Sequence, residues 1–358
     1  MAILLFGLSY FVLQINILEI SAEASSCTEQ NECVPLSICA PSPGRIIFPC
    51  HSGLNLYCCP SDRLTNDTLV NLLSRRKELF PVNCGVVYID NKITGGETAE
   101  LGEFPWMALL GYQQTQIKYI EYLCGGTLIT ENFVLTAAHC LKVGPNHKLV
   151  HVRFGEHDLN SQPDCHYIHE RYICADDPVD VPVHSFFIHD EYDSHSLKND
   201  IALVRLTKSV TFTDYVLPIC LPFNRNLENR DLTGQKLTIS GWGKTDSRKL
   251  GGSPVLQFAS VYVWEHQTCN RVVPPEVQPI IYSQLCANGK NKEDACKGDS
   301  GGPLSNSTFD IDDELRNYQI GIVSFASTMT CGLEDLPPIY TRVDRYLQWI
   351  VGIIEEQT

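Results

Sequence analysis

The sequence predicts an all-β fold for most of the chain, and three observations lead to this prediction. Beyond residue 93, short runs of strand-forming residues recur with turn residues between them. Long helical patterns do not separate these runs, which favours a sandwich or barrel over a parallel α/β sheet. At the end of the chain, apolar residues recur at helical spacing and predict a helix on the barrel surface.

The individual elements follow from these patterns. The strand-like runs are Cys124–Ile129, Phe133–Thr136, Val150–Phe154, Ile201–Leu206, Lys236–Ser240, Leu256–Val263, Gln319–Ser324 and Ile339–Val343. The predicted helical face consists of Tyr346, Leu347, Ile350, Ile353 and Ile354.

Size, charge and cysteine content limit the class of protein. At 358 residues, the chain is too long for one ordinary core, so two or three folded units are expected. Its formal net charge of −15 argues against nucleic acid or an anionic membrane as the main partner. Sixteen cysteines indicate an oxidising compartment, where disulfides form and persist.

Residues 1–24 are predicted to be a signal peptide. The stretch from Ala2 to Ile20 is mostly apolar and contains no Lys or Arg. Ala22-Glu23-Ala24 then provides a cleavage site of small residues. An uncleaved anchor is the alternative, because the apolar span is near membrane length. The chain is therefore expected to be secreted.

Residues 25–60 combine six cysteines with five prolines. This segment has too little apolar material for a core, so disulfides must hold the unit together. Six cysteines can pair in many ways, and the sequence alone does not choose among them. A zinc cluster is the rival interpretation, which secretion disfavours.

Residues 61–92 are expected to form a linker, because they are polar and charged with a basic cluster at Arg75-Arg76-Lys77. Cys84 is the single cysteine of this segment, so its partner must lie elsewhere in the chain. Asn66 here and Asn306 further on begin glycosylation sequons, which suit a secreted protein.

Ser300 is the candidate nucleophile. It lies between Gly298 and Gly301-Gly302, so a tight turn can expose its hydroxyl and aim the N–H groups of Gly298 and Ser300 at one point. A surface turn rich in glycine and serine is the alternative. Serine is a poor nucleophile at its own pKa, so catalysis requires a base and a group that orients the base.

Two further stretches supply those groups. His139 follows a strand-like run, and small alanines leave space around its imidazole. Asp200 lies at the start of an apolar run, where a buried carboxylate needs a partner such as a histidine N–H. For each residue alone, the alternatives are a histidine without a catalytic role and an aspartate that forms a cap or a turn. Their joint occurrence in the order His, Asp, Ser favours a catalytic triad.

The motifs TAAHC, NDIAL and GDSGGP, with Ile93-Thr94-Gly95-Gly96 ahead of them, resemble the trypsin/chymotrypsin family of serine endopeptidases. The resemblance covers residues 93–358 and implies two β-barrels with a C-terminal helix. The six-cysteine unit at residues 25–60 resembles the clip domain of arthropod clip-domain serine proteases.

The resemblance assigns roles to the candidate residues. It implies that His139 is the general base and then the general acid, that Asp200 orients it, and that Ser300 attacks the scissile carbonyl. The N–H groups of Gly298 and Ser300 would form the oxyanion hole. Ser324 matches a position that supports the triad aspartate and lines the substrate cleft.

Asp294 lies six residues before Ser300, where trypsin-like enzymes place the carboxylate of the primary specificity pocket. This position implies cleavage after Arg or Lys; a solvated charge is the alternative. The family usually has glycine where this chain has Ala326 and Pro338. With these substitutions, the sequence does not decide between Arg and Lys. A tighter pocket is the alternative.

The segment after Lys92 resembles a zymogen cleavage site. A freed ammonium on Ile93 would pair with Asp299, and ordering of the pocket would then follow cleavage. The alternative is that Lys92 is an exposed loop lysine. Cleavage after lysine implies an upstream trypsin-like activator and a place in a cascade.

Analogy with the family also implies seven disulfides and leaves Cys165 and Cys174 to form an eighth across an inserted loop. The expected pairs are Cys27–Cys58, Cys33–Cys50, Cys39–Cys59, Cys84–Cys220, Cys124–Cys140, Cys165–Cys174, Cys269–Cys286 and Cys296–Cys331.

The triad chemistry requires no cofactor, and structural calcium is the one metal that the resemblance suggests. Glu156 resembles the first ligand of the family's calcium loop, with Asp158 or Asp164 as oxygen partners. A zinc site is the alternative, because this loop also carries histidines beside two cysteines. Solvated loop histidines are the favoured interpretation in an oxidised chain.

The sequence therefore predicts a secreted zymogen of a trypsin-like endopeptidase in an extracellular cascade of hemolymph, in innate immunity, melanization or Toll-type signalling. The expected partners are another zymogen or a cytokine precursor as substrate, an activating protease and serpin-type inhibitors. Nucleic acid and membranes are not expected partners. A catalytically impaired clip-domain adaptor is the alternative, and a digestive trypsin is disfavoured by the cysteine-rich N-terminal unit.

Overall fold

The chain divides into two compact units, Met1–Thr68 and Leu69–Thr358. The computed structural model describes residues 31–35, 56–60, 79–86, 98–116, 118–168, 171–223, 231–244, 251–275, 279–289, 298–309, 314–325 and 336–358. In the first unit it describes one antiparallel hairpin, formed by β1 (Asn31–Pro35) and β2 (Leu56–Pro60). The expected domain boundaries at residues 24 and 92 lie outside the described residues.

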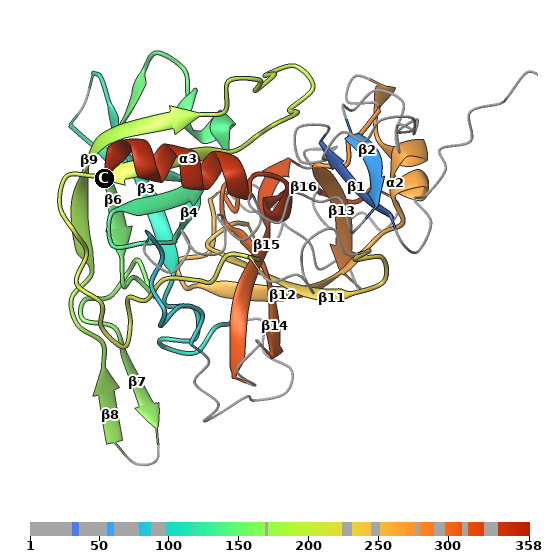
Figure 1. Ribbon diagram of the computed structural model, residues 1–358. Coiled ribbons are helices and arrows are strands. Elements are labelled where there is room, and N and C mark those ends of the chain that lie inside the picture. The colour runs from blue at the N-terminus through green and yellow to red at the C-terminus, as the bar shows by residue number, and fades with distance from the viewer. Residues whose placement is uncertain are drawn as a thin grey trace, which may run out of the picture. The chain divides into compact units, whose positions relative to one another are not determined.

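The second unit begins with a closed six-stranded barrel in the order β10-β5-β4-β3-β6-β9 (Figure 1). Alternate side chains point inward from its strands and form an apolar core that includes Val134, Val152 and Val204. The strands are β3 (Met107–Gln114), β4 (Ile120–Leu128), β5 (Phe133–Thr136), β6 (His147–Phe154), β9 (Val179–Ile188) and β10 (Ala202–Leu206).

A second closed barrel follows in the order β11-β12-β13-β16-β15-β14. Its own core includes Leu237, Val261 and Leu304, so each barrel has a separate apolar interior. The strands are β11 (Lys236–Gly241), β12 (Gln257–Val263), β13 (Gln284–Gly289), β14 (Pro303–Phe309), β15 (Leu315–Phe325) and β16 (Ile339–Arg342). The prediction of an all-β, two-barrel fold is confirmed.

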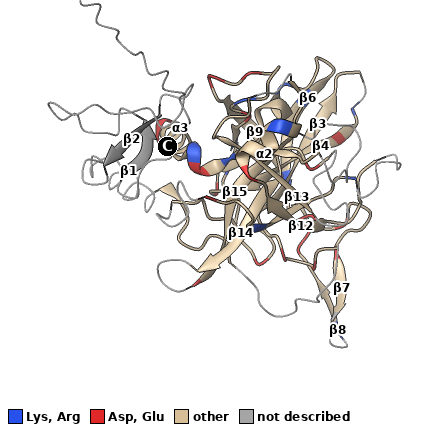
Figure 2. Cartoon of the chain, turned by 90° about the vertical axis from the view of Figure 1, so that its right-hand side faces the viewer, with Lys and Arg blue, Asp and Glu red and all other residues tan. Residues whose placement is uncertain are grey.

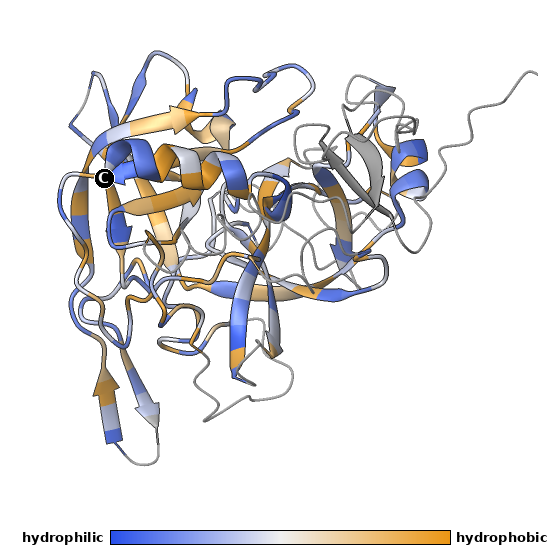
Figure 3. Ribbon diagram, in the orientation of Figure 1, coloured by the Kyte–Doolittle hydropathy of each residue, from blue (hydrophilic) through white to orange (hydrophobic). Residues whose placement is uncertain are grey.

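The C-terminal helix α3 (Leu347–Gln357) crosses back to the first barrel, although it follows the second in sequence (Figure 1). Apolar and polar residues mix along it, and its buried face consists of Leu347, Ile350, Val351 and Ile354 (Figure 3). Arg205 of β10 donates to the side chain of Gln357 at 3.1 Å, which fixes the end of the helix. The predicted surface helix is therefore confirmed.

Short elements complete the second unit. They are the 3₁₀ turns η3 (Ala138–Leu141) and η5 (Val343–Arg345), helix α2 (His266–Val272), and the strands β7 (Cys165–Ile168) and β8 (Arg171–Cys174). The β7–β8 hairpin projects from the barrels in both views (Figures 1 and 2). Among the described residues, no helix is long and apolar enough to span a membrane.

Residues 79–86 are fastened to the second barrel by more than a disulfide. Cys84 is bonded to Cys220, and the Gly85 N–H donates to the carbonyl of Pro218 at 2.7 Å. Asn317 returns a backbone hydrogen bond to the Gly85 carbonyl at 2.8 Å. Arg316 donates to the Cys84 carbonyl at 2.9 Å. This segment is thus an integral part of the second unit.

Gly85 is the residue of this segment that tolerates change least. Its φ is +60°, and a Cβ there would lie 2.2 Å from the carbonyl oxygen of Asn317. We expect Gly85→Ala to lower the free energy of unfolding by about 2–3 kcal/mol, and Tm by about 5–10 °C. Calorimetry of the zymogen measures the shift.

The matched control is Gly144→Ala, because a Cβ at Gly144 meets nothing within 4 Å. Its Tm should stay within about 2 °C of the parent protein. Equal Tm values for the two variants would contradict the close attachment of this segment.

Candidate active site

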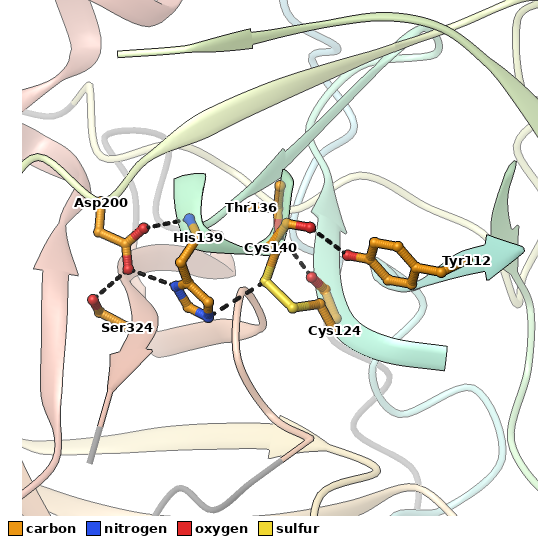
Figure 4. The surroundings of a disulfide bond; sticks show 8 residues. Tyr112, Cys124, Thr136, His139, Cys140, Asp200 and Ser324 are labelled. Atoms are coloured by element: carbon orange, nitrogen blue, oxygen red, sulfur yellow. Dashed lines mark hydrogen bonds and ion pairs between the residues drawn. A yellow bond between two sulfur atoms is a disulfide. The ribbon is translucent and has the colours of Figure 1, made fainter. Parts of the chain in front are cut away.

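His139 and Asp200 meet at one end of the first barrel (Figure 4). His139 lies in η3 directly after β5, and Asp200 directly precedes β10, the strand that pairs with β5. The Nδ1 atom of His139 is 2.8 Å from Oδ2 of Asp200, and the His139 backbone N–H donates to Oδ1 at 2.9 Å. Asp200 is completely buried, whereas 27% of the His139 side chain is exposed.

The second barrel supplies the remaining donors to Asp200. Ser324 of β15 donates its hydroxyl to Oδ2 at 2.5 Å, as the resemblance implied for this position. Thr341 of β16 donates to the Asp200 carbonyl at 2.9 Å, a contact that the sequence analysis missed. Because the ionised carboxylate only accepts, the proton of a neutral His139 lies on Nδ1. Nε2 then carries the lone pair that a general base needs.

Ser300 lies in a turn held between the barrels. Its carbonyl accepts the N–H of Gly125 in β4 at 2.8 Å, and the N–H of Gly301 donates to Val323 of β15 at 2.8 Å. Gly301 has φ +80°, and a Cβ there would lie 2.3 Å from the Thr136 hydroxyl oxygen. Only glycine fits at this position without displacing β5 or the turn.

A disulfide brings the serine turn and the histidine together. Cys124 precedes Gly125, Cys140 follows His139, and the two cysteines are bonded with an S–S distance of 2.03 Å. The Cys140 sulfur is 3.6 Å from His139 Nε2 (Figure 4) and would be 3.2 Å from a Cβ on Gly301. The imidazole and the serine turn therefore both pack against this bond.

The same three side chains, Cys124, His139 and Cys140, offer ligand atoms within 4.8 Å of one another. The sulfurs are oxidised to a disulfide, so they cannot supply the thiolates that zinc requires. The cluster is a structural support for the histidine.

Asp299 lies beside the serine in a pocket that the sequence analysis missed. Its Oδ1 accepts the N–H of Gly243 at 2.8 Å, and a Cβ on Gly241 or Gly243 would lie 2.2 Å from a carboxylate oxygen. Gly298 has φ +108°, and a Cβ there would lie 2.9 Å from Gly243 Cα. In the sequence, the Gly-Trp-Gly run at 241–243 is the feature that could have indicated this close contact with Asp299.

Part of the predicted site lies outside the described residues. This part comprises Lys92, Ile93, Asp294 and Ala326. The ion pair of Ile93 with Asp299 and the specificity pocket therefore stay predictions. Gly298 and Ser300 are described, and their role as the oxyanion hole is also a prediction. Pro338 is described: it is buried, and its carbonyl accepts the N–H of Ala287 at 3.3 Å.

Four disulfides join the cysteines that the family analogy pairs. They are Cys84–Cys220, Cys124–Cys140, Cys165–Cys174 and Cys269–Cys286. The side chains of the other eight cysteines lie outside the described residues. Of the two sequons, Asn66 also lies outside them, and Asn306 is a half-buried residue of β14 opposite Tyr318.

The expected calcium ligands face protein donors. Glu156 is buried, its Oε2 accepts from Arg153 at 3.1 Å, and its Oε1 accepts the His157 N–H at 3.1 Å. Burial and the Asp164 charge raise the pKa of Glu156, and the Arg153 guanidinium opposes this rise. Arg153 also pairs with Asp180 at 2.7 Å, so a fixed guanidinium neutralises this part of the loop.

The carboxylate of Asp164 also accepts hydrogen bonds from protein donors. Its Oδ2 accepts the N–H groups of His157 and Asp158 at 2.9 and 3.0 Å, and its Oδ1 accepts the Ser161 hydroxyl at 2.5 Å. Oδ1 of Asp158 accepts the Asn160 N–H at 3.0 Å. The oxygens named here already accept from protein donors, and a cation would compete with these donors for them. These contacts disfavour the expected calcium site, which stays a prediction.

This arrangement predicts stability that does not depend on calcium. We expect the Tm in excess EDTA and in excess CaCl₂ to agree within about 1 °C. Arg153→Ala, which uncovers Glu156, should lower the Tm in EDTA and make it respond to calcium. A parent protein whose Tm rises by several degrees with calcium would contradict the analysis.

Known proteins resemble this chain in sequence and in structure. The family model described as Trypsin matches residues 93–350. The "CLIP domain-containing serine protease B15" of Anopheles gambiae is 39% identical over 275 residues, which cover 76% of this chain and 72% of the relative. "Phenoloxidase-activating factor 1" of Holotrichia diomphalia is 35% identical over 378 residues, 98% of each chain.

Among solved structures, the Drosophila Grass clip serine protease of the Toll pathway superposes with a TM-score of 0.69 at 33% identity. The match covers 85% of this chain and 83% of that one.

Proposed function

The chain belongs to the trypsin family, among the clip-domain serine proteases of arthropods, and we propose that it is a catalytically active endopeptidase. The observation that carries the proposal is the buried Asp200 carboxylate, which holds His139 in one tautomer beside the Ser300 turn. An adaptor without activity would not need this arrangement, because a buried charge is costly to maintain.

In the proposed mechanism, His139 Nε2 accepts the hydroxyl proton of Ser300 as the serine oxygen attacks the scissile carbonyl. The imidazolium that forms is stabilised by Asp200, which stays ionised. The N–H groups of Gly298 and Ser300 stabilise the oxyanion, and loss of one such donor costs about 10²–10³ in rate. His139 then returns the proton to the leaving amine, and water repeats the sequence on the acyl-enzyme.

We assign specificity for Arg or Lys to Asp294, which would form an ion pair with the substrate side chain in a desolvated pocket. The side chains of Ala326 and Pro338 would narrow that pocket relative to one lined by glycine. The ratio of kcat/KM for paired Arg and Lys substrates measures the preference between them.

Activation is proposed to occur by cleavage after Lys92, with Ile93 moving to Asp299. The Cys84–Cys220 bond would keep the N-terminal unit attached to the activated enzyme. The relatives named for phenoloxidase activation and the Toll pathway support a place in an extracellular cascade. The substrate would then be another zymogen or a cytokine precursor, the activator a trypsin-like protease, and the inhibitors serpins of the hemolymph.

The first test treats the purified zymogen with a trace of trypsin-like protease. We expect a new N-terminus beginning Ile-Thr-Gly-Gly, two chains joined by a disulfide, and hydrolysis of Arg or Lys peptide substrates. Ser300→Ala should be cleaved in the same way and show no turnover. Clean cleavage of the parent protein without turnover of either substrate would overturn the proposal and favour the adaptor.

The second test examines the histidine tautomer. Asp200→Asn preserves the size of the side chain but offers an N–H where His139 needs an acceptor, so kcat should fall by about 10⁴. Asp193→Asn is the matched control, because Asp193 is an exposed carboxylate of the same loop, bonded to Ser196. Its kcat should stay within about twofold of the parent enzyme. Equal losses in both variants would contradict the assigned role.

A further inference from the structure

The residue before the triad aspartate has an unusual backbone conformation. Asn199 has φ +56°, and Leu197, two residues earlier, has φ +52°. The left-handed region costs a residue with a side chain of order 1 kcal/mol or more, although asparagine tolerates it best. The segment that leads into Asp200 is therefore strained and needs contacts that keep it in place.

Those contacts come from distant parts of the chain. The Tyr346 hydroxyl donates to Asn199 Oδ1 at 2.7 Å, and Asn199 Nδ2 donates to the carbonyl of Glu191 at 2.9 Å. Gln284 of β13 donates to the Leu197 carbonyl at 3.2 Å. The oxygen and the nitrogen of the Asn199 side-chain amide thus both form hydrogen bonds. Among these contacts, Tyr346 is the one side chain that donates to Asn199.

Tyr346 is well suited to hold this position. It is 5% exposed, directly precedes α3, and packs edge-on against His189 with ring centroids 5.2 Å apart. Burial raises its pKa, a side-chain hydrogen bond with Ser283 opposes this rise, and the Asp200 charge adds to it, so the hydroxyl remains protonated throughout the pH range of catalysis. The ring is fixed by packing, and its hydroxyl direction is fixed with it.

The backbone conformation of Asn199 determines the position of the Asp200 backbone. Downstream of that point, Thr341 holds the Asp200 carbonyl and Ser324 holds Oδ2. On the upstream side, the hydrogen bond from Tyr346 fixes the Asn199 side chain and with it the left-handed conformation. A carboxylate displaced by a few tenths of an ångström loses its alignment with His139.

We propose that Tyr346 is a positioning residue that acts through Asn199 to aim Asp200 at His139. The C-terminal segment thereby contributes to catalysis without touching substrate. This inference rests on the proposed protease function for its kinetic readout.

Tyr346→Phe tests the proposal, because it keeps the ring and removes one hydroxyl. In the activated enzyme we expect kcat to fall about 3- to 10-fold, because the Asn199 amide oxygen loses its donor, with KM within about twofold of the parent. The acid limb of the pH profile of kcat/KM should move to lower pH, since a less well aligned Asp200 stabilises the His139 imidazolium less.

Two further variants separate positioning from general stability. Asn199→Gly accepts φ > 0 freely but has no side chain, so adding Tyr346→Phe to it should reduce kcat no further. Val351→Ala removes buried apolar volume from α3 without touching Asn199, so it should lower Tm and leave kcat and the acid limb unchanged.

The outcomes that overturn the inference are specific. They are an unchanged kcat and pH profile in Tyr346→Phe, additive effects of Tyr346→Phe and Asn199→Gly, or the same kinetic change in Val351→Ala. If the parent protein has no activity, the proposed function fails separately. The NMR signal of the His139 Nδ1 proton then tests the positioning, and Tyr346→Phe should shift it while Val351→Ala does not.

Discussion

The buried carboxylate of Asp200 is the constraint on which the rest of the site depends. An ionised group without exposure is tolerated only when donors satisfy it fully, and here they come from η3 and β15. These elements belong to different barrels. The buried charge is therefore stabilised only when the two barrels pack in one relative position. The same packing orients His139.

The serine turn adds a second link between the barrels. Its backbone is bonded to Gly125 on one side and Val323 on the other, and the Cys124–Cys140 bond fixes the histidine to the same strand. Gly301 fills a space where any side chain would displace Thr136. Backbone and covalent contacts thus hold both the Ser300 turn and His139 to the same strand.

The loop after β6 shows how a protein can supply its own neutralising charge. Arg153 lies between Glu156 and Asp180, and backbone N–H groups fill the carboxylate of Asp164. The His157 carbonyl of this loop also accepts a hydrogen bond from the Trp242 indole N–H at 3.1 Å. The loop is therefore joined to the run that encloses Asp299, and its internal order supports the neighbourhood of the nucleophile.

The sequence by itself determined the strand-rich fold and the C-terminal helix, because spacing and short motifs are local properties. The same motifs predict that His139, Asp200 and Ser300 form a triad. Resemblance to a family also predicted three of the four disulfides that the structure describes, Cys84–Cys220, Cys124–Cys140 and Cys269–Cys286. It suggested calcium from three carboxylates in a loop, but a sequence does not reveal which donors will face them. Thr341 lies 141 residues from Asp200 in sequence, and Tyr346 lies 147 residues from Asn199. Only the folded barrels decide such contacts, because hydrogen bonds depend on distances that chain order does not specify.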